Sequence, residues 1–470
     1  MRIWGLLFSL LVSFQSEAGW LDELKEAYNK TRQSNETSSK QQMAELPSDF
    51  PDWLSLSRVR LQQLDSQVLV AEAGIKDKST VLLVHGLGQN GLKDWLTVIP
   101  VLAQHYRVVA IDLPGFGYST AKKGRYSPLT YSQVLAELIQ VKGLQSVHLV
   151  GHSMGGAVSL MFAAKYPELL SKLVLVDAAG ILERTAFVKA ISASKVSNSY
   201  VTDRLLEFST ELPDPTSLLR RSDTIWNLAL GSQENANAAL SLVETDFSSL
   251  IDKVQTDTHI IWGAEDKVAP LRTGKLLSKQ LSNAELHIIK GAGHVPMASH
   301  ADDFNQKLLY SLKTKVAPSS NISGEALTQD LVCENQSDKV YTGRYRSILI
   351  KGCKDISLHK ITTSKLKVIN SNVKAENLDI QNEVGIGLEC EKSMMEVTNM
   401  QLLASLPLKL SKCRFDLAGA RLEGESILLE VDKRSRVIWS ISRAHNSTEG
   451  VYLHGPKVWD KGSYGIQELN

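Results

Sequence analysis

The chain has 470 residues, of which 43% are hydrophobic and 22% are charged, and its formal net charge is +1. A chain of this length is too long for one typical hydrophobic core, so two domains are expected. The near-neutral charge argues against a nucleic-acid partner and against a polyanion-binding surface.

The first apolar segment runs from Trp4 to Phe14 and follows Arg2. It is too short to span a bilayer, and Ser-Glu-Ala follows it, so residues 1–18 are predicted to be a secretory signal peptide. An uncleaved N-terminal membrane anchor is the alternative. The protein is therefore expected to be exported, either to the periplasm or to the medium.

Residues 19–48 combine apolar residues at helical spacing with a stretch rich in Ser, Gln, Asn and Lys. This pattern predicts a short amphipathic helix followed by a flexible tether. We expect the helix to dock on the protein's own surface, with a membrane surface as the alternative.

Residues 49–316 alternate short apolar runs with helical patterns, which is typical of an α/β fold. Continuous apolar runs suit parallel strands covered on both faces, so an open parallel sheet with helices on both sides is expected. The predicted strands are 81–84, 108–111, 147–150, 173–176, 260–262 and 286–289. The predicted helices are 100–104, 132–140, 157–166, 271–281 and 301–312. A helical cap is predicted at about residues 180–255, in the long interval between the fourth and fifth strands.

The strand at 147–150 ends in residues 151–155, which read Gly-His-Ser-Met-Gly. A serine on a sharp strand-to-helix turn needs small neighbours two positions to either side, because a Cβ there would meet the flanking backbone. The helix that follows offers free N–H groups to developing negative charge. Ser153 is therefore the predicted nucleophile of an acyl-transfer reaction.

A serine hydroxyl attacks well only when a base removes its proton and a carboxylate orients that base. His294 lies in a glycine-framed turn after the last predicted strand and is the predicted base. Asp266 follows the strand before it and is the predicted acid, preferred to Glu265, with Asp177 as the reserve. Other histidines lack the glycine frame and are expected to be core or surface residues: His105, His148, His152, His259, His287 and His300.

The strand at 81–84 ends in a His-Gly pair, and a backbone N–H just beyond such a strand can point at a substrate carbonyl. Leu87 and Met154 are predicted to donate their N–H groups to the oxyanion. The turn at residues 112–119, Asp-Leu-Pro-Gly-Phe-Gly-Tyr-Ser, is expected to buttress the site rather than to react.

Together these motifs resemble the α/β-hydrolase superfamily, in its branch with a helical cap, over about residues 55–315. The resemblance implies the fold, a triad of Ser153, Asp266 and His294, and an acyl-enzyme mechanism that needs no metal or organic cofactor. The nucleophile is Ser rather than the Asp of dehalogenase and epoxide-hydrolase relatives, which implies an ester-type acyl intermediate. Met154 stands where the similar proline iminopeptidases have Trp, which argues against that activity.

The predicted function is an exported serine hydrolase that cleaves carboxylic esters with small to medium apolar acyl groups. The candidate pocket residues are Phe187, Trp226, Val268 and Val295; ordinary cap core is the alternative for the first two. A carbon–carbon bond hydrolase with the same triad is one alternative function. The other is a binding or adhesion protein whose C-terminal region carries the main role.

Residues 317–329 are polar and rich in turn formers, so they are predicted to be a linker. Beyond the linker, strand-like alternations recur at steps of 18 to 22 residues. One series is Ile348, Leu366, Leu388, Leu408, Leu429 and Val451, and a second is Ile356, Leu378, Met400, Leu422 and Ile441. Two series of similar period predict a separate all-β domain at residues 330–470, built as stacked coils of a parallel β-helix, with an antiparallel sandwich as the alternative. Its candidate partner is a polysaccharide or a protein surface.

All four cysteines lie in this last region, at Cys333, Cys353, Cys390 and Cys413. An even number in an exported chain is compatible with two disulfides, among three possible connectivities. Pairing Cys333 with Cys353 and Cys390 with Cys413 is the local option, and buried free thiols are the alternative. No Cys-x-x-Cys pair is present, so the cysteines predict no zinc site.

Overall fold

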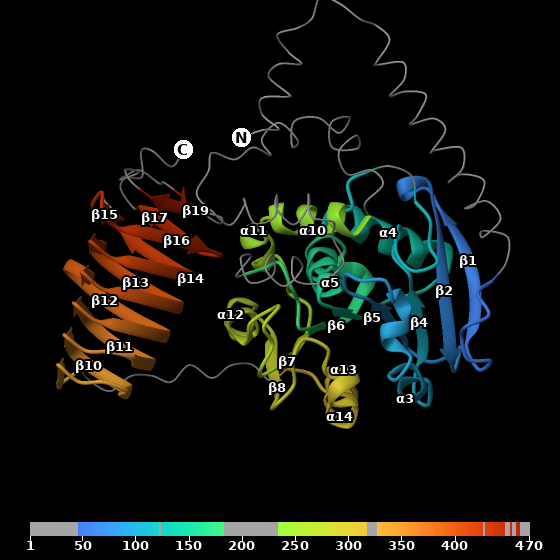
Figure 1. Ribbon diagram of the computed structural model, residues 1–470, viewed down its shortest axis with the longest axis horizontal. Coiled ribbons are helices and arrows are strands. Elements are labelled where there is room, and N and C mark those ends of the chain that lie inside the picture. Colours follow the sequence, from blue (N-terminus) through green and yellow to red (C-terminus); the bar gives the residue numbers. More distant parts are fainter. Residues whose placement is uncertain are drawn as a thin grey trace, which may run out of the picture. The chain divides into compact units, whose positions relative to one another are not determined.

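The structure is a computed structural model (Figure 1). It describes residues 46–121, 124–182, 234–316, 327–425, 428–446, 452–453 and 457–460. The predicted signal peptide and most of the predicted N-terminal helix, cap and linker lie outside these residues, as do Phe187 and Trp226. The described residues from Trp53 on belong to one compact unit. None of the helices in the described part of the chain is both long enough and apolar enough to cross a membrane.

Eight strands form one sheet in the order β1-β2-β4-β3-β5-β6-β7-β8 (Figure 1). Strands β3 to β8 run parallel to one another, whereas β1 and β2 form an antiparallel edge. The strands are β1 Ser55–Leu61, β2 Ser66–Gly74, β3 Thr80–Val84, β4 Arg107–Ile111, β5 Val147–His152, β6 Leu170–Val176, β7 Thr258–Gly263 and β8 Ala284–Ile289. The six predicted strands and their parallel pairing are thus confirmed, and β1 and β2 add an antiparallel edge that was not predicted.

The helices of this part of the chain follow the predicted alternation with the strands. They are α3 Ile99–Ala103, α4 Pro128–Val141, α5 Met154–Lys165, α10 Glu234–Glu244, α11 Ser248–Ile251, α12 Leu271–Gln280, α13 Pro296–Ser299 and α14 Ala301–Lys313. Short 3-10 turns lie at η1 Gln63–Asp65, η2 Gly91–Trp95 and η3 Pro167–Leu169. Helix α5 is buried all round from Met154 to Ala163, so it is held in the protein core rather than by one amphipathic face.

The C-terminal β-domain, described from residue 327 on, is a stack of parallel strands (Figure 1). Each of the strands β9 to β13 pairs in parallel with the next one along the chain. The strands are β9 Asp330–Glu334, β10 Val340–Lys351, β11 Ile356–Ile369, β12 Asn372–Glu391, β13 Met394–Ser411, β14 Arg414–Gly424, β15 Leu429–Val431, β16 Arg436–Ser440, β17 Arg443–Asn446, β18 Tyr452–Leu453 and β19 Lys457–Asp460. An all-β domain is confirmed, and the antiparallel sandwich is wrong for β9 to β14.

The first apolar series forms one ladder from Ile348 to Leu429, and its last member, Val451, lies outside the described residues. Ile348 pairs with Leu366, and the pairing continues through Leu388 and Leu408 to Leu429. All these side chains are buried, so the ladder is part of the domain's core.

The second series is wrong as one ladder. Leu378 pairs with Met400, but Ile356 pairs with Val373, and Leu422 pairs with Leu402. The paired strands shift register at irregularities between Thr363 and Leu366 and between Asn382 and Ile386. Such irregularities change the number of residues per coil. Residues at equal steps in the sequence therefore do not pair with one another throughout the stack.

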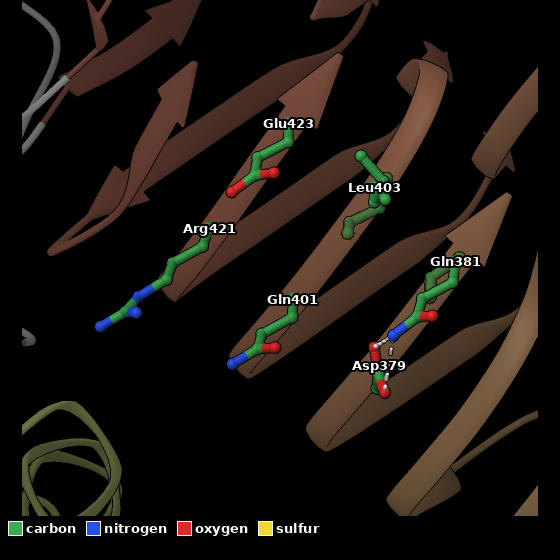
Figure 2. A pocket seen from close by; sticks show the side chains of 8 residues that line it. Asp379, Gln381, Gln401, Leu403, Arg421 and Glu423 are labelled. Atoms are coloured by element: carbon green, nitrogen blue, oxygen red, sulfur yellow. Dashed lines mark hydrogen bonds between the residues drawn. The ribbon is translucent and has the colours of Figure 1, made fainter. Parts of the chain in front are cut away.

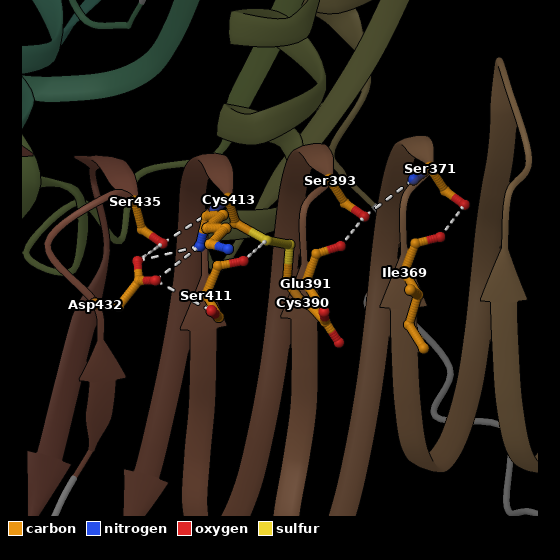
Figure 3. The surroundings of a disulfide bond; sticks show 10 residues. Ile369, Ser371, Cys390, Glu391, Ser393, Ser411, Cys413, Asp432 and Ser435 are labelled. Atoms are coloured by element: carbon orange, nitrogen blue, oxygen red, sulfur yellow. Dashed lines mark hydrogen bonds between the residues drawn. A yellow bond between two sulfur atoms is a disulfide. The ribbon is translucent and has the colours of Figure 1, made fainter.

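A repeated corner joins successive coils (Figure 3). The hydroxyl of Ser371 accepts the N–H of Cys353 at 2.9 Å, and that of Ser393 accepts the N–H of Ser371 at 3.0 Å. Two coils further along, the hydroxyl of Ser435 accepts the N–H of Cys413 at 3.0 Å. These bonds satisfy buried backbone donors where the strands turn.

The structure bonds Cys333 to Cys353 and Cys390 to Cys413, which is the local pairing (Figure 3 shows the second). Cys353 and Cys413 both occupy the repeated corner. Each disulfide joins two neighbouring coils that a backbone bond also joins, from Asn335 N–H to Lys351 O for the first and from Lys392 N–H to Ser411 O for the second, both at 2.9 Å.

Helix α12 contacts the C-terminal β-domain through a polar network. Arg272, whose side chain is 10% exposed, donates to Thr398 Oγ1 at 2.7 Å and to Asp416 Oδ1 at 3.0 Å. Gln280, at the end of the helix, donates to the carbonyl oxygen of Gly419 at 2.9 Å. These bonds give the buried guanidinium of Arg272 its hydrogen-bond partners and attach α12 to the C-terminal β-domain.

Candidate active site

Ser153 lies between β5 and α5 with φ 53° and ψ −119°, a strained conformation for a residue with a side chain. Its backbone is held on both sides, because its N–H donates to Val176 O at 2.9 Å and its carbonyl accepts from Ala179 N at 3.1 Å. The turn thereby keeps the hydroxyl at the carboxyl edge of the sheet, next to the start of α5.

The glycines around Ser153 are required by close backbone contacts. A Cβ on Gly151 would lie 2.2 Å from the carbonyl oxygen of Gly155, and one on Gly155 would lie 2.3 Å from that of Val84. Real Cβ atoms do not approach backbone oxygens so closely, so any other residue would displace the turn.

The structure brings the three predicted triad side chains together. His294 Nε2 lies 2.9 Å from Ser153 Oγ, and His294 Nδ1 lies 2.8 Å from Asp266 Oδ2. The other carboxylate oxygen of Asp266 accepts the N–H groups of Val268 at 2.8 Å and Ala269 at 3.0 Å. The Asp266 side chain is fully buried, so these bonds hold its carboxylate toward the imidazole.

The turn after β3 passes directly beside Ser153. A Cβ on Gly86 would lie 2.9 Å from Ser153 Cβ and 3.4 Å from its Oγ. Buried His85 fixes this turn, because its Nε2 accepts the N–H of Leu113 at 2.9 Å while Nδ1 lies 2.6 Å from the Gly86 carbonyl oxygen. Leu87 and Met154, the predicted oxyanion donors, therefore follow Gly86 and Ser153 directly on two adjoining turns.

The turn at residues 112–119 supports the site through Asp112. Its carboxylate accepts the N–H of Leu92 at 2.6 Å and the N–H of Tyr118 at 2.8 Å. Burial raises the pKa of Asp112 above its ordinary value. A Cβ on Gly117 would lie 2.3 Å from Asp112 Oδ2, so this glycine lets the loop close over the carboxylate.

His152 was expected to be a core or surface residue, and the structure gives it a contact with the triad. Its Nε2 lies 2.7 Å from the carbonyl oxygen of His294. Burial lowers the pKa of His152 to about 3, so the ring is neutral near pH 7 and Nε2 donates its proton to the carbonyl. The only sequence signal for this role is its place beside the nucleophile.

Asp177, the predicted reserve acid, is buried behind the triad. Its Oδ1 accepts the N–H of Gly263 at 2.8 Å, and its Oδ2 has no hydrogen-bond partner. Burial, and then the charge of Asp266, raise the pKa of Asp177 well above its ordinary value. The imidazole of His294 bonds to Asp266, so the preferred acid and not the reserve lies at the imidazole.

Of the candidate pocket residues, Val268 and Val295 are described. Val268 is partly buried and contacts the hydrophobic core, and its backbone N–H holds Asp266. Val295 follows His294 and is 39% exposed. Glu265, the acid that was not preferred, is exposed and makes its backbone bond to Ala292.

A second candidate surface lies on the C-terminal β-domain (Figure 2). Asp379, Gln401 and Arg421 stand on paired positions of three successive strands, so their side chains form a row. Gln381 Nε2 donates to Asp379 Oδ1 at 3.2 Å, and Glu423 lies beyond Arg421 along β14. The groove lined by these residues is polar and carries charges of both signs.

Known proteins resemble the α/β region of the chain, which precedes the C-terminal β-domain. The family model of the alpha/beta hydrolase fold matches residues 79–213. A 2-hydroxy-6-oxononadienedioate/2-hydroxy-6-oxononatrienedioate hydrolase of Pseudomonas putida is 30% identical over 280 residues, 53% of this chain and 94% of that protein. Lipase 1 of Psychrobacter immobilis is 29% identical over 250 residues, 50% of this chain and 78% of the lipase.

Among solved structures, an esterase from Exiguobacterium antarcticum is 21% identical, with a TM-score of 0.44, and the match covers 55% of this chain and 99% of the esterase. The match to the P. putida hydrolase spans nearly all of that relative. The chain therefore belongs to the alpha/beta hydrolase family.

Proposed function

We propose that this hydrolase is a serine hydrolase that cleaves carboxylic esters with small to medium apolar acyl groups. The observation that carries the proposal is the unbroken line of hydrogen bonds from Ser153 Oγ through His294 to Asp266. A serine hydroxyl bonded to an imidazole, which is itself bonded to a buried carboxylate, is the arrangement that activates serine for acyl transfer.

In the proposed mechanism, His294 Nε2 takes the proton of Ser153 as Oγ attacks the acyl carbonyl carbon. Asp266 stabilises the imidazolium that forms, and the N–H groups of Leu87 and Met154 bind the oxyanion. His294 then gives the proton to the leaving alcohol, which leaves an acyl-enzyme. Water, deprotonated by His294, attacks this ester and releases the acid and free Ser153.

The test is the hydrolysis of a series of chromogenic esters of increasing acyl length by the full chain and by Ser153→Ala. We expect the variant to lose at least about 10³-fold in kcat while it keeps the circular dichroism spectrum of the parent. Ser159→Ala is the matched control, since Ser159 Oγ donates to Gly155 O in the same helix and does not contact His294. Turnover by Ser153→Ala at the parent rate would remove the mechanism.

Carbon–carbon bond hydrolysis of diketone-like compounds is the second candidate function. It is supported by the name of the P. putida relative, which is 30% identical to this chain. A dienoate substrate with a vinylogous 1,5-diketone, assayed beside the esters, separates the two functions by the ratio of their kcat/KM values. A ratio that favours the diketone would replace the ester proposal while the triad remains.

We also propose that the protein is exported. Both disulfides of the C-terminal β-domain support this proposal, because such bonds persist in oxidising compartments. Fractionation of cells that express the full chain, followed by mass measurement of its N-terminus, tests for export and for cleavage after Ala18.

The polar groove of Figure 2 supports the proposal that the C-terminal β-domain contacts a polysaccharide or a protein surface. Pull-down of full-length Ser153→Ala on insoluble polysaccharides, with Arg421→Ala as the groove variant, tests the first of these partners. Equal retention of both proteins would argue against the groove.

A further inference from the structure

Away from the triad, β7 and β8 carry a cluster of two histidines and one glutamate. Glu285 and His287 are two residues apart on β8, so they project from the same face of the strand, and Glu285 pairs with His259 on β7. His259 Nδ1 lies 3.0 Å from His287 Nε2 and 3.7 Å from Glu285 Oε2, and His287 Nε2 lies 3.9 Å from Glu285 Oε1. Strand pairing therefore brings three metal-binding donor groups close together.

The separations between the three donor groups, measured to Glu285 Oε2 from His259 and to Glu285 Oε1 from His287, are compatible with a tetrahedral ion. Zinc bonds to nitrogen and oxygen are about 2.0–2.2 Å long, which sets ligand atoms about 3.4 Å apart around a tetrahedral ion. The three observed separations lie on both sides of that value and within about 0.5 Å of it. Small side-chain rotations are enough to complete the geometry.

A backbone carbonyl orients the inner ligand. His259 is fully buried, and its Nε2 lies 3.2 Å from the carbonyl oxygen of Thr314. A carbonyl only accepts, so Nε2 holds the proton and the lone pair of Nδ1 faces His287 and Glu285. Proteins commonly orient metal-binding imidazoles in this way.

The surroundings of the cluster also suit a cation. Burial lowers the pKa values of His259 and His287 below their ordinary value. Their rings stack with an interplanar angle of 13°. Glu285 is 39% exposed, which leaves one side open for the entry of an ion and for a water ligand.

Two lysines lie near the cluster, and each has a carboxylate partner. The charge of Lys172 acts on His259, and its Nζ lies 2.9 Å from Asp257 Oδ2. The charge of Lys307 acts on His287, and Lys307 is paired with Asp303. These ion pairs reduce the repulsion that an incoming cation meets.

We propose that His259 Nδ1, His287 Nε2 and the Glu285 carboxylate bind one divalent transition-metal ion, zinc by the donor set, with water as the fourth ligand. The ion joins β7 to β8 and, through His259, to Thr314 at the end of α14. Its role is structural, because the cluster lies within the two strands while Asp266 and His294 follow their carboxyl ends. The inference goes beyond the proposed esterase activity and does not depend on it.

The test is zinc titration of the full chain, freed of any histidine tag and treated with chelator, by isothermal calorimetry and by thermal unfolding. We expect one Zn²⁺ per chain at micromolar affinity or better, and a rise in Tm of several degrees. His287→Ala should abolish this binding, and Glu285→Gln should weaken it roughly tenfold or more. His105→Ala, an exposed histidine of the same domain, and His294→Ala, which reports any zinc at the triad, should bind as the parent does.

Cobalt provides a readout that requires no variant to fold. Four-coordinate Co²⁺ bound by nitrogen and oxygen ligands has intense visible bands, whereas Co²⁺ in water is nearly colourless, so the parent chain should develop these bands and lose them on addition of zinc. The absence of binding, or binding by His287→Ala as tight as the parent's, would overturn the proposal. The two imidazoles would then be a hydrogen-bonded pair and no more.

Discussion

Strands β7 and β8, together with the loops that follow them, carry an imidazole and a carboxylate at each end. The two ends have different roles. At the carboxyl ends of β7 and β8, Asp266 and His294 lie on loops next to Ser153 and the start of α5. In the first half of the strands, His259 and Glu285 are fixed by strand pairing. At the first of these two ends, the hydroxyl of Ser153 bonds to the imidazole next to the start of α5.

This comparison shows that position along the strand, more than residue type, decides which chemistry an imidazole and a carboxylate support. Loops at the carboxyl edge of a parallel sheet are free to converge on one point beside a helix N-terminus. Residues inside strands are held at fixed spacing, which suits a coordination site but leaves no room for an acyl substrate. Changes at the triad end should therefore affect kcat, and changes at the other end should affect stability.

Among the variants that test this comparison, Asp266→Asn is expected to have the largest effect on kcat. The N–H groups of Val268 and Ala269 require an acceptor, so the Asn oxygen faces them and its NH₂ faces His294 Nδ1. Nδ1 must then accept, which places the imidazole proton on Nε2, where it cannot take the proton of Ser153. We expect kcat to fall by about 10³- to 10⁴-fold with KM within about threefold, as measured with the best ester.

Glu265→Gln is the matched control for this variant, because Glu265 is the adjacent carboxylate, is exposed and does not bond to His294. Its kcat should equal the parent's. If Asp266→Asn retained more than a tenth of the parent kcat, the acid would have to be sought elsewhere, with buried Asp177 as the nearest carboxylate.

His152→Phe sharpens the comparison, because it removes a side-chain bond to the backbone of the triad loop and leaves the three triad side chains in place. The Phe ring keeps most of the volume but leaves the His294 carbonyl without its donor, a loss of about 1–3 kcal/mol. We expect kcat to fall by roughly 10- to 100-fold and KM to change little, because His152 is a positioning residue. His152→Gln, whose amide can donate to the same carbonyl, should recover part of the rate.

The pH dependence of stability provides a separate check on His152. Its pKa is about 3 in the folded protein and ordinary when unfolded, so the unfolded chain binds more protons below about pH 6.5. The parent therefore loses stability as the pH falls from about 6.5 toward 3, and His152→Phe loses less over that range. Parallel Tm–pH curves for the two proteins would contradict a buried neutral ring.

Much of the fold was predictable because continuous apolar runs mark the six strands from β3 to β8. Strand β1 lacks that signal, since it is largely half-exposed and its alternation is weak, whereas the buried apolar run at residues 68–71 of β2 carries the signal and was not used. In the C-terminal β-domain, the ladder from Ile348 to Leu429 was predictable from its period. The residues of the second series do not form one ladder, because the strands shift register between Thr363 and Leu366.

The glycine-framed positions of Ser153 and His294 carry a local sequence signal, because Gly151 and Gly155 have no room for a Cβ and Gly291 has a φ of 76°. The contact of His152 with the His294 carbonyl joins residues 142 positions apart, and the cluster of His259 with His287 depends on strand pairing. Such contacts arise only from the tertiary fold, so no local pattern predicts them.

The smallest expected effect is that of Asp177→Asn, at the buried carboxyl group behind the triad. Because its pKa is raised in the folded state, the folded protein binds more protons here than the unfolded chain, and stability falls as the pH rises above about 4 toward the folded pKa. Asn is neutral and isosteric, and its oxygen can still accept the N–H of Gly263. We expect kcat within about threefold of the parent and a Tm advantage of a few degrees for the variant at pH 8 that shrinks toward pH 4. A Tm advantage that grew toward acid pH, or a loss of kcat as large as that of Asp266→Asn, would mean that Asp177 is ionised and shares the work of the acid.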